Sequence, residues 1–481
     1  MSQQYRSIPL FSNRSIHELS NETPLKLQFS DSGDLVAQRY GELLINQVVA
    51  EPYAQGLFRL YLRELSDNGI VSSCPLMGMG VPFSFGENSI CWRTYLRDSL
   101  DVYTTIHLHP ESSAWMWTIN IRNLTSDAIT VDTLLAQDIG LGDEPAVKNN
   151  EAYNSQYLDL NPLEDDEMGW VVVARQNQPT GEGQNPVLTV GCLEGADHYA
   201  TDATQFFGLN HRMTNEVAAL KLEELPSERL QYECSIAGLQ SKKQTIEPGE
   251  IVSIRYVAHF TPDHPNRTNM ADAEILRRYK EWSYKPINLD SDFSTTGTSL
   301  FVGTDYKSGD APLESDWEKW FPGEKRHKEL SPDGELLSFF YGKETHVVSL
   351  LKEASMWRTH GHILKSGDTV AHDPNHFGVT CYASGIFGIQ AYLGNPSLNR
   401  FIPVIRNQLG ILRYSGQRIF VKIENHWTLL GVPSVFSIEP DSVRWIYRLG
   451  KTVIEVRCWC SIQHPASFLD INVLEGPSCE F

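Results

Sequence analysis

Apolar and polar residues alternate along most of the chain with a period of two. Every second residue of Trp115–Ile121 is large and apolar, and the same pattern occurs in Val252–Phe260 and Thr452–Ile462. Turn signals such as Lys365–Asp368 separate these runs. Strands with one apolar face must pack against another sheet, so the pattern predicts a mainly β fold made of sandwiches.

One segment departs from this alternation. In Ala271–Trp282, Ile275, Leu276 and Tyr279 are spaced as on one face of a helix. Acidic residues come first and basic residues last, an order that suits the helix dipole. We therefore expect three regions: a first β-sandwich over 1–265, a helical linker and polar connector over 266–334, and a second β-sandwich over 335–481.

The two predicted sandwiches share a faint internal repeat. Phe83–Trp92 resembles Phe436–Trp445, and Ile119–Ile121 resembles Ile471–Val473 further along. Three single residues also recur in order, as Gln47, Phe58 and Arg63 in the first copy and Gln390, Phe401 and Arg406 in the second. Chance similarity among β-rich segments is the alternative explanation, which the common order of the landmarks disfavours.

The repeat has a consequence for the second sandwich. In the first copy the strand pattern continues from Ile121 to Phe260, whereas few residues follow Val473 in the second. An unfinished sheet leaves an unpaired edge and an uncovered apolar face. We expect the second sandwich to be incomplete, although a smaller and self-sufficient sandwich would also fit.

Composition and charge narrow the possible partners. The chain has 40 Lys and Arg against 60 Asp and Glu, a formal charge of −20. This balance argues against nucleic acid and anionic membranes, and it is compatible with a neutral ligand such as a sugar. No stretch is apolar enough to cross a bilayer, the start has no signal-like apolar core, and the eight Cys show no zinc or redox motif. We expect a cytoplasmic protein with free thiols.

Several segments carry a resemblance to a known family. Asp132–Gly142 and Asn150–Tyr157 resemble the N-terminal β-supersandwich of glycoside hydrolase family 94, the cellobiose phosphorylase family. Gly378–Gly394, Asn407–Phe420 and Leu430–Ser434 resemble the second sandwich of 1,2-β-oligoglucan phosphorylases. The resemblance implies two supersandwich domains of the galactose-mutarotase type.

The same resemblance implies where catalysis occurs. In that family a C-terminal α/α barrel carries a general-acid Asp, and inorganic phosphate attacks the anomeric carbon with inversion. No segment of this sequence matches the barrel, so no catalytic residue can be assigned. We expect the non-catalytic N-terminal portion of a β-1,2-glucan phosphorylase. Its expected partners are a β-glucan oligosaccharide, the missing catalytic barrel and a possible second copy of the chain, and no cofactor is expected.

The candidate substrate-binding residues lie in the Asn150–Tyr157 string. Its amides and phenols are the groups that bind sugars by hydrogen bonds and ring stacking. The candidates are Asn150, Glu151, Tyr153, Asn154 and Gln156. The alternative is a structural turn whose amides cap backbone groups.

Two other clusters are weaker candidates. His360, His362, His372 and His376 could form a zinc site, but neither an HExxH helix nor paired Cys supports it, so hydrogen-bonding His side chains are expected and no metal. The acidic run Glu164–Glu167 is expected to be a solvated loop.

Three functional hypotheses remain open at this point. The chain is a portion of an enzyme whose barrel lies elsewhere, a stand-alone carbohydrate-binding module, or a phosphorylase or other glycosyltransferase active in its own right. The sequence favours the first of these.

Overall fold

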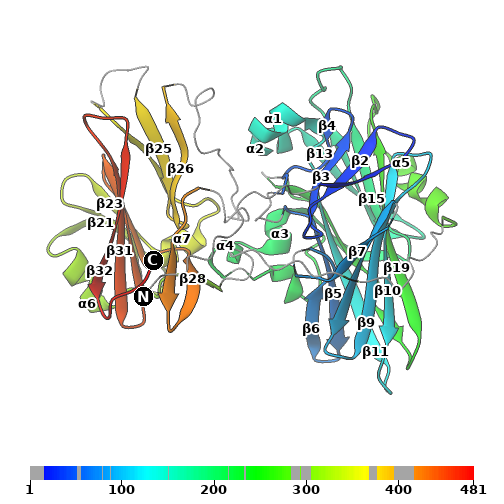
Figure 1. The fold of residues 1–481 in the computed structure, drawn as a ribbon, viewed down its shortest axis with the longest axis horizontal. Helices are drawn as coiled ribbons and strands as arrows, with labels where there is room; N and C mark the ends of the chain where they lie inside the picture. The colour runs from blue at the N-terminus through cyan, green and yellow to red at the C-terminus, as the bar shows by residue number, and fades with distance from the viewer. Residues whose placement is uncertain are drawn as a thin grey trace, which may run out of the picture. The chain divides into compact units, whose positions relative to one another are not determined.

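The computed structural model describes residues 16–481 of the 481-residue chain, with gaps at 51–55, 79, 87, 150, 215, 232–233, 283–292, 294–304, 368–375 and 395–415. The chain forms two compact units (Figure 1). The first unit contains Met1–Phe206 and Ala219–Ser299, and the second contains Phe207–Ala218 and Leu300–Phe481. Strands dominate both units, which confirms the predicted mainly β fold.

The first unit is built from two sheets. The larger, 14-stranded sheet contains β5 (Arg59–Ser66), β6 (Gly69–Pro75), β7 (Phe83–Phe85), β8 (Ser89–Leu96), β9 (Leu100–Leu108), β10 (Ala114–Asn123), β11 (Ile129–Asp138), β13 (Leu158–Asp165), β14 (Gly169–Gln176), β15 (Val187–Cys192), β16 (Ala196–Asp202), β17 (Ser235–Ser241), β18 (Gln244–Ile246) and β19 (Ile251–Thr261). The smaller sheet contains β1 (His17–Ser20), β2 (Leu25–Phe29), β3 (Leu35–Tyr40), β4 (Leu43–Leu44) and β12 (Gly142–Asp143).

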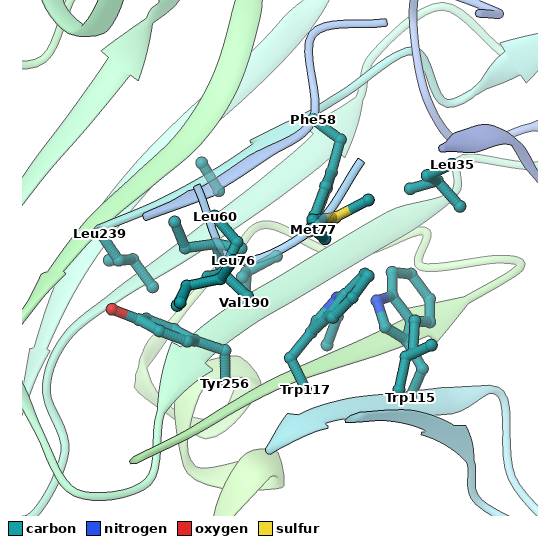
Figure 2. Close-up of a cluster of buried hydrophobic side chains, with 14 of the residues drawn as sticks. Leu35, Phe58, Leu60, Leu76, Met77, Trp115, Trp117, Val190, Leu239 and Tyr256 are labelled. Carbon is teal, nitrogen blue, oxygen red and sulfur yellow. The ribbon is translucent and has the colours of Figure 1, made fainter. Parts of the chain in front are cut away.

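Side chains of both sheets line the core of the first unit. Trp115, Trp117, Ile119 and Ile121 of β10 are all at most 1% exposed, as their alternation predicted. Trp117 stacks on Phe58 with ring centroids 4.8 Å apart (Figure 2). Side chains of the smaller sheet belong to the same apolar cluster. The two sheets therefore share one hydrophobic core, as in a sandwich.

Short helices cover parts of the first unit. They are α1 (Glu144–Asn149), α2 (Glu151–Ser155), α3 (Ala203–Phe207, whose last residue is counted with the second unit), α5 (Met270–Glu274), and the 3-10 helices η1 (Ala218–Leu220, whose first residue is also counted there) and η2 (Ile275–Tyr279). Where the sequence predicted one helix over Ala271–Trp282, the chain forms α5 and then tightens into η2. The predicted apolar face is present, because Leu276 and Tyr279 are at most 1% exposed.

The second unit has three sheets. The seven-stranded sheet contains β21 (Lys325–Leu330), β22 (Leu336–Tyr341), β23 (Thr345–Ser349), β29 (Val435–Ile438), β30 (Ser442–Leu449), β31 (Thr452–Cys460) and β32 (Ser467–Glu475), with neighbours in the order β21-β22-β23-β29-β30-β31-β32. The three-stranded sheets contain β24 (Gly361–Lys365), β25 (Phe377–Tyr382) and β26 (Ile386–Leu393), and β20 (Asp305–Lys307), β27 (Phe420–Ile423) and β28 (His426–Leu430). The helices are α4 (His211–Thr214), α6 (Glu314–Trp320) and α7 (Leu350–Ser355).

A second apolar core joins sheets of this unit. Trp445 of β30 is fully buried and meets Phe387 of β26 edge-on, with ring centroids 4.8 Å apart. Its indole N–H donates to the Tyr382 carbonyl over 3.0 Å, so the ring is fixed at both ends. The sheet β24-β25-β26 thus packs against the seven-stranded sheet in a sandwich-like arrangement.

The strand pairing supports the internal repeat. Ile119 lies opposite Thr104 in the β10–β9 pair, and Ile471 lies opposite Val456 in the β32–β31 pair. Ile471 comes 352 residues after Ile119, and Val456 comes 352 residues after Thr104. β32 therefore pairs with β31 in the same register in which β10 pairs with β9. The landmarks Phe401 and Arg406 lie outside the described residues.

A buried ion pair ties a loop to the large sheet. Arg63 of β5 and Asp132 of β11 have fully buried side chains, and their closest N–O distance is 2.6 Å. Arg63 also donates to the carbonyls of Ala219 and Leu222, and Gln240 donates to Asp132. Each charge is therefore paired and hydrogen-bonded, which is the condition for a stable buried ion pair.

We expect Arg63→Met to lower the free energy of unfolding of the first unit by about 3–5 kcal/mol, because the Asp132 carboxylate would remain buried without its partner. Faster native-state hydrogen exchange of β5 and β11 would show the loss. Arg229→Met is the matched control, since the Arg229–Asp159 pair is 45% and 34% exposed. This control should lower the free energy of unfolding by less than about 1 kcal/mol. Equal costs in the two variants would contradict this account.

Candidate functional site

The predicted glycan loop, Asn150–Tyr157, follows α1 and contains α2, and α1 is anchored to the first unit. Glu144, the first residue of α1, accepts from Arg39 over 2.9 Å and pairs with Lys148 at 2.5 Å. The Arg39 guanidinium is the main reason that the pKa of Glu144 falls to about 2. The carboxylate is thus charged under ordinary conditions and holds α1 on β3.

Asn154, one of the predicted binding residues, points into the protein. Its side chain is 7% exposed and donates to the Gly140 carbonyl over 2.5 Å. Its oxygen accepts from Gln176 at 3.3 Å and would lie 2.7 Å from a Cβ at Gly142, so a larger residue at 142 would force the Asn154 side chain to shift. Asn154 therefore fits the alternative hypothesis, in which the amides of this segment satisfy backbone groups.

Tyr153 and Gln156, two other predicted residues, are exposed. Tyr153 is 48% exposed, and Tyr157 donates a hydrogen bond to its hydroxyl over 2.8 Å. The two rings meet edge to face with centroids 5.0 Å apart. This hydrogen bond raises the pKa of Tyr157, so the Tyr157 phenol stays neutral at physiological pH.

Glu151 begins α2, and Asn150 lies outside the described residues. We name the exposed surface formed by Tyr153, Gln156 and Tyr157 the tyrosine surface.

Two residues distant in sequence complete this surface, and the sequence analysis missed both. Gln231 donates to the carbonyls of Gln156 and Leu158. Arg229 pairs with Asp159 at 2.6 Å. Amides, phenols and a guanidinium–carboxylate pair on one surface are groups that bind sugar hydroxyls. No local pattern could connect 229–231 with 156–159, because only the folded chain brings them together.

A buried carboxyl lies close to the loop. Asp138, at the end of β11, is 1% exposed and accepts from the backbone N–H groups of Gln47 and Val48 over 3.1 and 2.9 Å. Burial raises the pKa of Asp138 to about 7, although those two hydrogen bonds act in the opposite direction. Because the group has almost no contact with solvent, we assign it a structural role and not a catalytic one.

The raised pKa of Asp138 predicts a pH-dependent stability. The folded state keeps a proton that the unfolded state releases near its ordinary pKa of about 4. This stabilisation is complete below about pH 4 and is lost as the pH rises through about 7. Asp138→Asn stays neutral and can still accept both backbone hydrogen bonds, so it should be more stable than the parent chain at pH 8 and similar at pH 4. Urea unfolding at the two pH values tests this, and an Asn variant that is less stable at pH 8 would refute it.

A shallow depression of about 530 Å³ lies elsewhere on the first unit. It is lined by residues from the β6 hairpin and from the segment after η1, namely Asn68, Gly69, Ile70, Val71, Ser72, Ser73, Leu220, Lys221 and Glu223. Glu223 is the one carboxylate in this lining, whereas glycoside hydrolases use two acids across the bond. The depression offers a polar surface without an acid–base pair.

The histidine cluster does not form a metal site in the described part of the chain. Across the described ranges, no group of three or more His, Cys, Asp and Glu side chains is placed to hold an ion. His360 instead lies 2.7 Å from the buried Glu353, and His372 lies outside the described residues. No helix in the described ranges is long and apolar enough to span a membrane.

Solved structures of low similarity were found. A polysaccharide lyase aligns over 92% of this chain and 47% of its own, with 8% identity and a TM-score of 0.34. A galactose 1-epimerase from Lactobacillus acidophilus NCFM aligns over 52% of this chain and 95% of its own, with 9% identity and a TM-score of 0.30.

Two sequence families match successive parts of the chain. The SOGP N-terminal domain matches residues 28–257, and the glycoside phosphorylase supersandwich domain matches residues 321–481. A 1,2-beta-oligoglucan phosphorylase from Listeria innocua serovar 6a is 30% identical over 455 residues, which cover 94% of this chain and 40% of that protein. The chain thus spans less than half the length of this curated relative. The two consecutive domain matches and this identity show that the chain is similar to glycoside phosphorylases over most of its length.

Proposed function

We propose that this chain is the non-catalytic N-terminal portion of a β-1,2-glucan phosphorylase, in which it contacts the glycan and packs against the catalytic portion. The order of the two domain matches is the observation that carries this proposal. One match is to an N-terminal domain and the next is to a glycoside phosphorylase supersandwich domain, and the name of the relative supports a β-1,2-glucan as substrate.

The site geometry fits a supporting role in catalysis. The carboxyl beside the predicted loop, Asp138, is buried, and the depression on the first unit is lined by one carboxylate. The sealed Asp138 carboxyl cannot reach a glycosidic oxygen, and the lining of the depression lacks the second acid that hydrolysis requires. The catalytic groups are accordingly assigned to a barrel-bearing polypeptide, in the same protein or a separate one.

A glycan-binding role for the tyrosine surface is the second candidate function, and it also holds if the chain acts as a stand-alone binding module. The half-exposed Tyr153 ring, fixed edge to face against Tyr157, offers a rigid apolar face to a sugar ring. The Gln231 side chain donates to the backbone carbonyl of Gln156, which brings a further amide to this surface as a potential partner for hydroxyl groups.

We expect the chain alone to release no glucose 1-phosphate from β-1,2-gluco-oligosaccharides and inorganic phosphate. Adding the part of the Listeria relative that this chain does not match should produce release above that of either polypeptide alone. Phosphorolysis by the isolated chain would contradict the non-catalytic assignment.

We expect Tyr153→Ala to weaken binding of β-1,2-gluco-oligosaccharides about three- to tenfold, the equivalent of about 0.5–1.5 kcal/mol for one aromatic contact. Isothermal titration calorimetry measures this. Tyr95→Ala is the control, because Tyr95 is 49% exposed on β8 and outside the tyrosine surface. An equal loss in both variants, or none in Tyr153→Ala, would reject the site.

A further inference from the structure

The strand β32 combines a free edge with exposed apolar side chains. It pairs with β31 and is the last strand of the seven-stranded sheet in the described part of the chain. Phe468, Leu469 and Leu474 are 46%, 38% and 42% exposed. A strand edge with unpaired N–H and C=O groups beside apolar side chains is a template for pairing with another strand.

The first unit contains the completed form of the same arrangement. Its strand β10 pairs with β9 in the register that β32 keeps on β31. The other edge of β10 is occupied by β19, antiparallel, with Ile119 opposite Ile254 and Trp117 opposite Tyr256. The first unit therefore shows which element belongs on the free edge of β32.

Burial differs at equivalent core-facing positions. Trp117 and Ile119 of β10 are at most 1% exposed. Their counterparts in the shared register are Leu469 and Ile471, of which Leu469 is 38% exposed and Ile471 is half-buried. Both side chains project toward the core of the second unit, since they lie opposite Cys458 and Val456 in that core. A neighbouring strand would cover them, as β19 covers β10.

We infer that the free edge of β32 docks one antiparallel strand, chemically like β19, that the catalytic portion of the phosphorylase donates. The main-chain groups of β32 supply the hydrogen bonds, and apolar donor residues cover Leu469 and Ile471. The identity of the donor rests on the proposed function, because the relative has most of its length outside the region matched by this chain.

The register also predicts the sequence of the donor. Residues equivalent to Ile254 and Tyr256 should be large and apolar, because they would lie opposite Ile471 and Leu469. The position between them corresponds to Arg255, which lies opposite Thr118 in the first unit. Its counterpart on β32 is the exposed Asp470. A basic donor residue there would meet an opposite charge.

Hydrogen exchange read by mass spectrometry tests the inference, with the unmatched part of the Listeria relative as the probe. Binding should slow exchange in β32 at least tenfold and leave β21, the opposite edge of the same sheet, unchanged. Leu469→Lys should abolish this protection, whereas Leu330→Lys is the matched control because Leu330 is 55% exposed on β21. Unchanged exchange in β32, or equal slowing in β21, would overturn the inference.

Release of glucose 1-phosphate in the same mixture separates this inference from the proposed function. Protection of β32 without release supports strand docking and rejects the phosphorylase role. Release without protection of β32 supports the phosphorylase role and overturns strand docking.

Discussion

A strand is protected from further pairing when both of its edges are paired and its apolar face is covered, and this constraint distinguishes two equivalent strands of the molecule. β10 meets it fully, because β9 and β19 flank it and its core-facing residues are buried. β32 is paired on one edge, by β31, in the register that β10 keeps on β9. The two units therefore share one strand arrangement, which is closed at β10 and open at β32. The open edge of β32 is the surface where we propose that a further strand binds.

Much of the fold could be predicted from local pattern. Alternation identified β10, β19 and β31, because a strand with one buried face must place apolar side chains at every second residue. The repeat could be predicted because equivalent strands carry similar residues at equivalent positions. The change from α5 to η2 was not predictable, since the spacing of Leu276 and Tyr279 fits either helix type.

The site was predictable only in part, because its contacts are distant in sequence. The composition of Asn150–Tyr157 indicated a polar loop, yet it could not show that Asn154 turns inward while Tyr153 turns outward. Burial of a polar residue depends on the elements packed over it. The ion pair of Arg63 with Asp132 and the contact of Gln231 with Gln156 also depend on the folded arrangement.

The proposed function implies a division of labour between this chain and a catalytic portion. The described sandwiches offer a polar surface with aromatic rings and an open strand edge, and bond cleavage would take place elsewhere. The carboxyl whose pKa burial raises to about 7, Asp138, is sealed inside the protein, in keeping with that proposal.

The central claim is that β32 is an open edge and β10 is a closed one. Native-state hydrogen exchange of the isolated chain, resolved to single amides, tests it most directly. The account predicts that alternate amides of β32 exchange at nearly unprotected rates, while the amides of β10 exchange only through opening of the first unit. Protection of every β32 amide to the level of β10 would contradict the claim.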